Sequence, residues 1–228
     1  MSGRTKGNVT DVGAEPPIPL TETDLYNLSV SDKDFKPHTW ENLKEIIASN
    51  KLEKLVRWPS DTKRYMKWTA ETKKEYGSII NFVAKERLRW TPRTTPEGGL
   101  TFDYESPIPF QSVNDYKTLP NDWPYGLEHG ISHIIVWLKN RLEIQPPPGD
   151  LTPAAKARVN AFIDKEFVQP LAQLTGEGDN VIWFKNWVAL QSVPGIDHVH
   201  ILLRNVPKSI VDDRWTKGEQ PLSLTVDV

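Results

Sequence analysis

The order of four segments in the C-terminal half most strongly constrains the fold. Residues 131–138 (Ile-Ser-His-Ile-Ile-Val-Trp-Leu) form a nearly continuous apolar run, which is typical of a buried strand. A long helix follows, with Thr152 as the N-cap residue and Pro153 at the first helical position. Two further strands are expected over residues 181–190 and 198–203. The order strand, helix, strand, strand predicts an α+β layer with the helix on one face.

The rest of the chain divides at two places. Residues 1–35 are rich in Pro, Ser, Thr, Gly and Asp and show no sustained periodicity, so we expect a largely disordered tail. Residues 36–92 carry apolar side chains at helical spacing and predict a helical, basic extension. Residues 93–228 are expected to form the α+β core.

Within the extension, one helical run is expected to end at Pro59 and a second helix to begin near Thr69. Residues 51–93 hold twelve Lys or Arg and five Asp or Glu, a local charge of +7 in a chain whose net charge is −2. Such a charge attracts phosphates, although it is also typical of solvated helix faces. The following residues, 91–130, are rich in Pro and Gly and are expected to form loops.

Composition excludes several classes of protein. The chain has no Cys, so disulfides, thiolate zinc sites, iron–sulfur clusters and a cysteine nucleophile are all excluded. No apolar segment reaches the length of a membrane span, and we expect a cytoplasmic protein without a membrane partner. The basic stretch matches no nucleic-acid-binding motif and the pI is near 6.2, so a nucleic-acid partner is not expected. The sequence leaves the oligomeric state open.

Three histidines are the best candidates for chemistry. His198 and His200 lie two residues apart on a predicted strand, so their side chains point to the same side. His133 lies near the start of the other apolar strand and would meet the pair if the two strands are neighbours. Asn186, Gln191 and Ser192 precede the pair and offer amide, hydroxyl and backbone donors for a phosphate.

Three interpretations of this cluster remain open. Neutral imidazoles are zinc ligands, although Asp197 is the one carboxylate beside them in the sequence. Histidines at the end of a sheet can also be structural, hydrogen-bonded to the backbone. A neutral imidazole is also a nucleophile that forms a phosphoramidate with a phosphate, and a second imidazole orients it.

The layout resembles the histidine-triad superfamily over roughly residues 108–204, and in particular its galactose-1-phosphate uridylyltransferase branch. The resemblance implies a histidine-triad-like antiparallel sheet with a long packing helix. It implies that His200 is the nucleophile, that His198 supports it and that His133 lines the site. The segments that carry it are His133-Ile134-Ile135-Val136, Phe184-Lys185-Asn186, Gln191-Ser192-Val193 and His198-Val199-His200.

Two departures from the superfamily pattern keep a non-catalytic alternative open. Leu202 stands where the superfamily has a third His or a Gln that contacts the bound phosphate. Residues 194–197 are inserted between the polar turn and the histidine pair. A chain that departs in this way either has altered chemistry or binds its ligand without turnover.

A second resemblance covers most of the chain and is to the fungal N-acetylglucosamine-induced protein family. That family is cytosolic, and its name implies a link to amino-sugar metabolism without establishing a reaction. The segments that carry the resemblance are Trp58-Pro59, Tyr76-Gly77-Ser78, Lys85-Glu86-Arg87-Leu88, Asn121-Asp122-Trp123-Pro124-Tyr125-Gly126 and Trp183-Phe184-Lys185-Asn186-Trp187.

Together the two resemblances imply a protein that binds a nucleotide sugar or sugar phosphate and transfers a nucleotidyl group through a histidine, with no cofactor or metal. Trp123, Tyr125 and Trp187 are then candidates for stacking on a base or sugar, with core packing as the alternative for each ring. Lys139 is a candidate phosphate contact. The alternatives are a non-catalytic sensor on the same scaffold and a zinc-dependent hydrolase.

Overall fold

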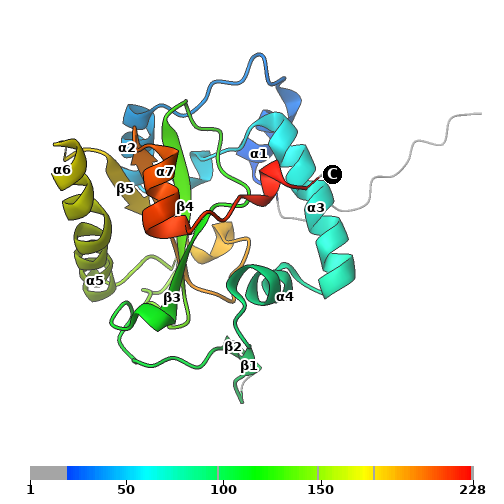
Figure 1. Ribbon diagram of the computed structural model, residues 1–228. Coiled ribbons are helices and arrows are strands. Elements are labelled where there is room, and N and C mark those ends of the chain that lie inside the picture. The colour runs from blue at the N-terminus through cyan, green and yellow to red at the C-terminus, as the bar shows by residue number, and fades with distance from the viewer. Residues whose placement is uncertain (1–19, 97, 148, 177, 227–228) are drawn as a thin grey trace, which may run out of the picture.

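A four-stranded antiparallel sheet lies at the centre of the fold (Figure 1). The computed structural model describes residues 20–96, 98–147, 149–176 and 178–226. The predicted α+β fold is confirmed, and the predicted strand 131–138 has the same bounds in the structure. In order across the sheet, the strands are β3 (Tyr116–Pro120), β4 (Ile131–Leu138), β6 (His198–Arg204) and β5 (Val181–Phe184).

Two strand predictions differ from the structure. The segment 91–130, expected to be loops, contributes edge strand β3, whose last residue is Pro120. A proline is tolerated at an edge but not within a central strand, so it does not exclude this pairing. The predicted strand 181–190 ends at Phe184, and Val188–Leu190 forms a 3-10 turn instead. Short β1 (Arg93–Thr94) and β2 (Leu100–Thr101) form a separate hairpin.

One face of the sheet is covered by the long predicted helix. The helix consists of α5 (Pro153–Ile163), a π-helical turn (Asp164–Val168) and α6 (Gln169–Thr175). Pro170 has no amide to give to the Glu166 carbonyl, and the Trp215 indole Nε1 donates to that oxygen at 3.2 Å. The strand side chains that pack against this helix are Ile134, Val136, Leu138, Val199, Ile201 and Leu203.

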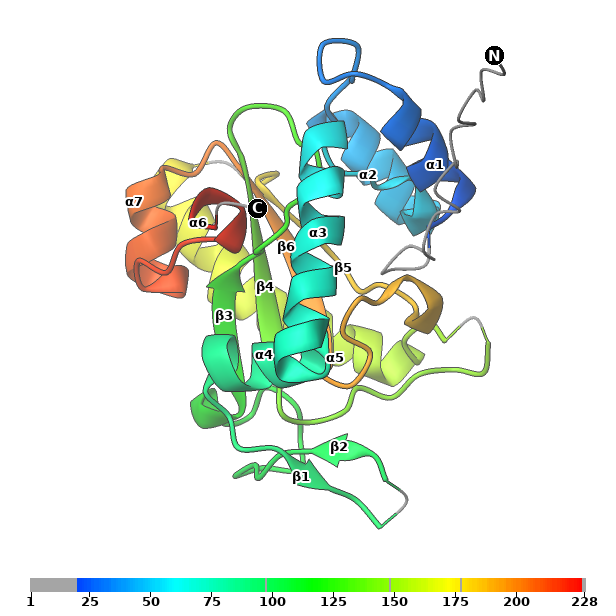
Figure 2. The ribbon, with the colours of Figure 1, turned by 90° about the vertical axis from the view of Figure 1, so that its right-hand side faces the viewer.

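The opposite face is covered by the N-terminal helices (Figure 2). Pro59 was expected to end a helix, but it occupies the first turn of an 18-residue helix, where a missing amide costs nothing. The helices are α2 (Trp40–Ala48), α3 (Pro59–Tyr76) and α4 (Ile79–Phe82), followed by a π-helical turn (Val83–Leu88). Strand alternation places His133, Ile135, Trp137, His198, His200 and Leu202 on this face.

The start of the described chain packs on the N-terminal helices, whereas the C-terminal segment packs with both helical layers: Val211 with the long helix and Leu222 with the N-terminal helices. Most of the tail predicted to be disordered, residues 1–19, lies outside the described residues. The described part of this predicted tail instead contains a helix, α1 (Glu22–Ser29), which begins with a capping box between Thr21 and Asp24. Its Asn27 side chain donates to the Arg57 carbonyl at 2.8 Å. The C-terminal segment holds α7 (Lys208–Val211), a π-helical turn (Asp212–Thr216) and a 3-10 turn (Leu222–Leu224).

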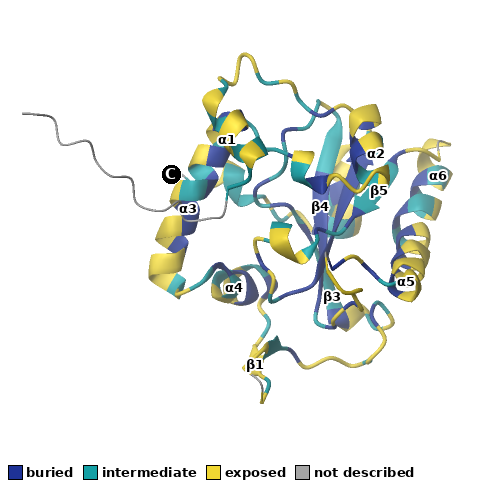
Figure 3. Cartoon of the chain, turned by 180° about the vertical axis from the view of Figure 1, so that it is seen from behind, coloured by how far each residue is buried: buried dark blue, intermediate teal, exposed yellow. Residues whose placement is uncertain are grey.

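Burial follows these layers. Figure 3 shows the central strands buried between helices whose outer sides are exposed. Among the described residues, no helix is both long and apolar enough to cross a membrane.

A buried carboxylate organises the loop before β3. Asp115 is fully buried, and its carboxylate accepts the backbone amides of Glu105 and Ser106 at 2.8 to 3.0 Å. Hydrogen bonds to a buried charged acceptor are among the stronger ones in proteins. This carboxylate therefore fixes the path of the segment that leads into the sheet.

We expect Asp115→Asn to lower the free energy of unfolding by about 2–3 kcal/mol, because the new amide places a donor against backbone donors. Urea unfolding followed by circular dichroism measures the change. Asp103→Asn is the matched control, because Asp103 is exposed and is paired with exposed Arg93. Equal effects of the two substitutions would contradict the role assigned to Asp115.

Candidate functional site

The three candidate histidines lie together on the face of the sheet that the N-terminal helices cover. Strands β4 and β6 pair so that Ile135 lies opposite His200 and Trp137 opposite His198. His133 Nε2 is 3.0 Å from His200 Nδ1. The ring centroids of His198 and His200 are 5.2 Å apart. All three imidazoles therefore form one cluster, in which His200 is the middle member.

The hydrogen bonds assign the proton on two of the rings. The Ile196 carbonyl can only accept, so His198 Nδ1 donates to it at 2.8 Å and carries the proton. The bare Nε2 of His198 has no hydrogen-bond partner among the described residues. The Asn186 amide nitrogen lies 3.4 Å from His200 Nε2 and can only donate, so the His200 proton is on Nδ1, facing His133.

Burial keeps the cluster neutral. Desolvation lowers the pKa of His133 to about 3 and the pKa of His198 to about 4. It lowers the pKa of His200 well below 6.5, and the neighbouring imidazoles lower it further. Neutral imidazoles are able to act as nucleophiles, metal ligands or hydrogen-bonding groups.

A cavity of about 290 Å³ opens onto His198 and His200. Tyr65, Trp68 and Trp123 form one wall, with ring centroids 5.6 to 6.0 Å apart. Buried polar atoms normally have partners, so unpartnered ones that line a cavity point to a ligand. Four such atoms, among the described residues, belong to side chains that line this cavity: Glu53 Oε2, Thr69 Oγ1, Trp123 Nε1 and Asn186 Oδ1.

Arg57, which is not among the residues predicted from the sequence, also lines the cavity. Its Nε donates to the Trp123 carbonyl at 2.9 Å, and its guanidinium lies 4.4 Å from the Tyr65 ring centroid and 5.5 Å from that of Tyr125. No carboxylate in the described part of the chain forms an ion pair with it. The Arg57 charge contributes to the lowered pKa of His133 and His200. The cavity therefore has a cation held by aromatic rings rather than by an anion.

Most of the predicted binding residues lie at this cavity. Tyr125 stacks on His133 at 5.3 Å between ring centroids, and its hydroxyl accepts from Asn186 at 3.2 Å. Gln191 donates to the Asn186 carbonyl at 2.6 Å, and Ser192 lines the cavity.

Two predicted residues, Trp187 and Lys139, lie elsewhere. The chain leaves the sheet after Phe184, so the Trp187 ring packs with the cluster of Trp40 and Leu43. Lys139 follows the end of β4, where its ammonium is 3.9 Å from Asp115 and 5.8 Å from the Trp90 ring centroid. The structure therefore assigns both residues to other surroundings than the histidine cavity.

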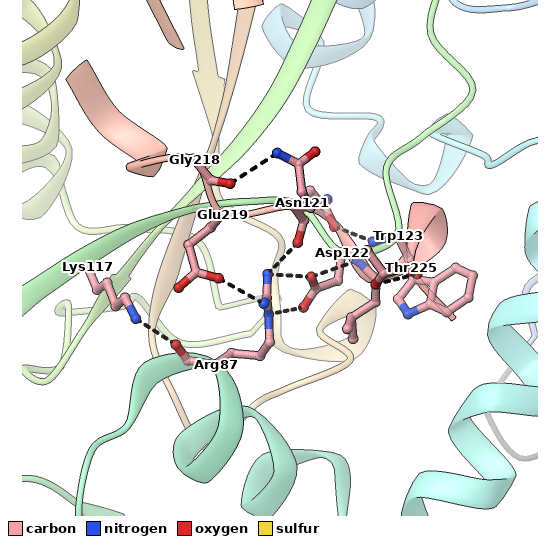
Figure 4. A network of polar contacts seen from close by, with 10 residues as sticks. Arg87, Lys117, Asn121, Asp122, Trp123, Gly218, Glu219 and Thr225 are labelled. Carbon is pink, nitrogen blue, oxygen red and sulfur yellow. Dashed lines mark hydrogen bonds and ion pairs between the residues drawn. The ribbon is translucent and has the colours of Figure 1, made fainter. Parts of the chain in front are cut away.

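Asn121, which contacts His133, lies beside a polar network around Arg87 and Asp122, and Figure 4 shows this network. Its amide nitrogen lies 3.1 Å from His133 Nε2, and its oxygen accepts from the Trp123 amide at 3.0 Å. Next to it, the Asp122 carboxylate lies 2.8 Å from Arg87, and burial raises the pKa of Asp122 to about 6. Arg87 is thus neutralised and is not available to a phosphate.

The described residues contain no set of three His, Cys, Asp or Glu side chains arranged to hold a metal ion. His133 and His200 are hydrogen-bonded to each other, and His198 Nδ1 is bound to the backbone. The zinc-dependent alternative therefore lacks a ligand set in the described part of the chain.

The fold and site define an α+β protein with a buried histidine cluster beside an aromatic cavity. A family model described as "Protein of unknown function (DUF3605)" matches residues 39–204, and the chain belongs to this family. The matched range includes the three histidines, Arg57, Asn121 and Asn186.

Named relatives support the same family. N-acetylglucosamine-induced protein 1 of Candida albicans is 30% identical over 220 residues, which is 92% of this chain and 85% of the relative. A Saccharomyces cerevisiae protein described as uncharacterized is 32% identical over 192 residues, 81% of this chain and 91% of the relative. The predicted resemblance to the N-acetylglucosamine-induced family is confirmed.

A solved structure is also similar. The crystal structure of HTC1 matches with a TM-score of 0.59 and 31% sequence identity, over 81% of this chain and 98% of that chain.

Buried neutral histidines make stability depend on pH. The unfolded chain takes up protons near pH 6.5, whereas the folded protein does not, so the free energy of unfolding falls as the pH drops below 6.5. Each such histidine adds about 1.4 kcal/mol per pH unit to the slope of the free energy of unfolding against pH.

We expect His133→Gln to lower this slope by about 1.4 kcal/mol per pH unit between pH 6 and pH 4.5, because one buried neutral imidazole is removed. Urea unfolding at each pH measures the change. An unchanged slope would mean that His133 is protonated in the folded protein.

Proposed function

We propose that this protein binds a nucleotide sugar or sugar phosphate in the cavity beside the histidine cluster and transfers a nucleotidyl group through a histidine nucleophile. The observation that carries the proposal is the combination of two neutral imidazoles, His198 and His200, and Arg57, which has no ion-pair partner among the described residues, at a single aromatic cavity. His133, which was predicted to line the site, does not line this cavity and contacts His200, which does.

Arg57 supports the phosphate part of the proposal. Its Nε donates to the Trp123 carbonyl, while no hydrogen bond or ion pair with another described residue engages its two terminal nitrogens. A guanidinium is suited to two phosphate oxygens at once, and the surrounding rings strengthen this interaction by excluding water. Its charge also contributes to the lowered pKa of His133 and His200.

The aromatic wall and the unpartnered polar atoms support the nucleoside or sugar part. Trp68 and Trp123 offer flat surfaces for a base or a sugar ring. Glu53, Thr69 and Asn186 supply acceptors and a hydroxyl without protein partners in the described chain. A ligand with several hydroxyl or N–H groups fits that set. The name of the Candida albicans relative refers to induction by N-acetylglucosamine, which makes derivatives of this sugar the first ligands to test.

The placement of the histidines supports a histidine-triad-like core. The His-x-His pair lies on central strand β6, a third histidine on neighbouring β4, and the long helix on the opposite face. Leu202 occupies the position at which the histidine-triad superfamily has a third His or a Gln. It is fully buried and packs with Trp40 and Leu43 of α2. The packing thus favours an apolar residue there, and the same feature favours a non-catalytic sensor as the second candidate function.

We expect Arg57→Gln to weaken binding of UDP-N-acetylglucosamine or N-acetylglucosamine 1-phosphate by about tenfold to a hundredfold, because it removes a charged donor to phosphate. Isothermal titration calorimetry measures the affinity. Arg141→Gln is the control, because Arg141 is an exposed arginine that does not line this cavity.

Wild-type protein that binds neither these compounds nor other nucleotide sugars would contradict the proposal. Binding without any turnover would favour the sensor. An Arg57→Gln variant that binds as tightly as wild type would remove Arg57 from the phosphate site.

A further inference from the structure

We infer that the nucleophile of the proposed transfer is His198, acting through Nε2, and that His200 positions the site rather than forming the covalent intermediate. The inference rests on the proposed function. The resemblance to the uridylyltransferase branch implies a different nucleophile, His200.

His198 has the hydrogen bonding that a nucleophilic imidazole needs. Its Nδ1 proton is held by the Ile196 carbonyl at 2.8 Å, so the lone pair is on Nε2. Nε2 has no partner in the described chain, and the residue lines the cavity. Its ring packs against Trp137 at 4.5 Å between centroids, which restricts rotation. The lone pair is therefore free, fixed in direction and next to the ligand space.

The carbonyl that orients His198 belongs to a rigid segment. Ile196 is buried, and the Asp197 carboxylate accepts the Leu142 amide at 2.6 Å and lies 3.5 Å from the Lys185 ammonium. The Asp197 carbonyl also accepts the Leu138 amide at 2.8 Å. Because the neighbouring Asp197 is held through both its carboxylate and its carbonyl, the Ile196 carbonyl keeps its position while charge develops on the ring.

His200 is engaged at both ring nitrogens. Its Nε2 faces the Asn186 amide at 3.4 Å, and its Nδ1 faces His133 Nε2 at 3.0 Å. Its ring stacks on Phe184 at 4.7 Å with an interplanar angle of 3°. An attack by His200 Nε2 would require that the Asn186 contact breaks. The same contacts instead suit a positioning residue that holds the Asn186 amide, whose unpartnered Oδ1 belongs to a cavity-lining side chain.

The covalent step is a nucleophilic displacement at phosphorus, in which one bond forms as another breaks and no electrons are supplied from outside. The His198 Nε2 lone pair forms a bond to the α-phosphorus of a nucleoside diphosphate sugar. The bond from that phosphorus to the bridging oxygen breaks, and its electrons leave with the sugar phosphate. The ring becomes a cationic phosphoramidate whose Nδ1 proton still donates to the Ile196 carbonyl, which stabilises the positive charge. A phosphate oxygen of a second sugar phosphate, or a water molecule that loses a proton to solvent, then attacks the phosphorus, and the P–N bond electrons return to Nε2.

Adduct mapping in the wild-type protein tests the inference without any variant. The protein is mixed with UDP-N-acetylglucosamine radiolabelled at the α-phosphate, and in parallel with GDP- and ADP-sugars. It is denatured at alkaline pH, digested, and the labelled peptide is sequenced by mass spectrometry. We expect the label on His198. A label on His200 overturns the inference and leaves the proposed function standing, whereas no histidine label with any donor overturns the proposed transfer and the inference together.

Variants supply a second test. We expect His198→Gly to lose the adduct and to regain donor cleavage when imidazole is added, because free imidazole fits the vacated position. We expect His200→Gln to keep the adduct on His198 at a reduced rate. His129→Gln is the matched control, because His129 does not line the cavity. Imidazole rescue of a His200→Gly variant, but not of His198→Gly, would overturn the inference.

The tautomer provides a readout independent of ligand and turnover. Long-range nitrogen-15 NMR of the imidazoles is expected to show the His198 proton on Nδ1 and a bare Nε2. A proton on His198 Nε2 would remove the lone pair and overturn the inference.

Discussion

The pairing register of β4 with β6 is the constraint on which the site depends. It sets His133, His198 and His200 on one face and Ile134, Val199 and other aliphatic side chains on the other. A slip of one residue would turn the imidazoles into the core beneath α5 and α6, and it would expose the aliphatic side chains to the cavity. The packing of the long helix therefore secures the histidines, although it touches the opposite side of the sheet.

Desolvation and one cation together give the site its electrostatic character. Burial makes protonation of the imidazoles costly, and Arg57 adds to that cost for two of them. Arg57 in turn is stabilised by the faces of Tyr65 and Tyr125 rather than by a carboxylate. A neutral nucleophile and an anion-binding group thus coexist at one cavity, and no carboxylate among the described residues forms an ion pair with the arginine.

The sequence predicted the parts of the fold that depend on local periodicity. Residue spacing predicted strand β4, the N-cap of α5 and the shared face of His198 and His200. The contact of His200 with His133 required in addition only that the two apolar strands be neighbours. Arg57 was missed because its role depends on rings brought from Tyr65 and Tyr125. Trp187 and Lys139 were misplaced because each follows a strand end, where the chain turns and alternation no longer applies. Edge strand β3 was missed because its pairing is decided by β4.

The strand order has a consequence for synthesis of the chain. Strand β6 is the last strand in the sequence, yet it lies between β4 and β5. Neither of those strands can complete its pairing until residues near Arg204 have left the ribosome. Until then β4, the longest strand, has only the short edge strand β3 beside it, and one long hydrogen-bonding edge remains open. The nascent protein is therefore most exposed to aggregation just before its central strand arrives.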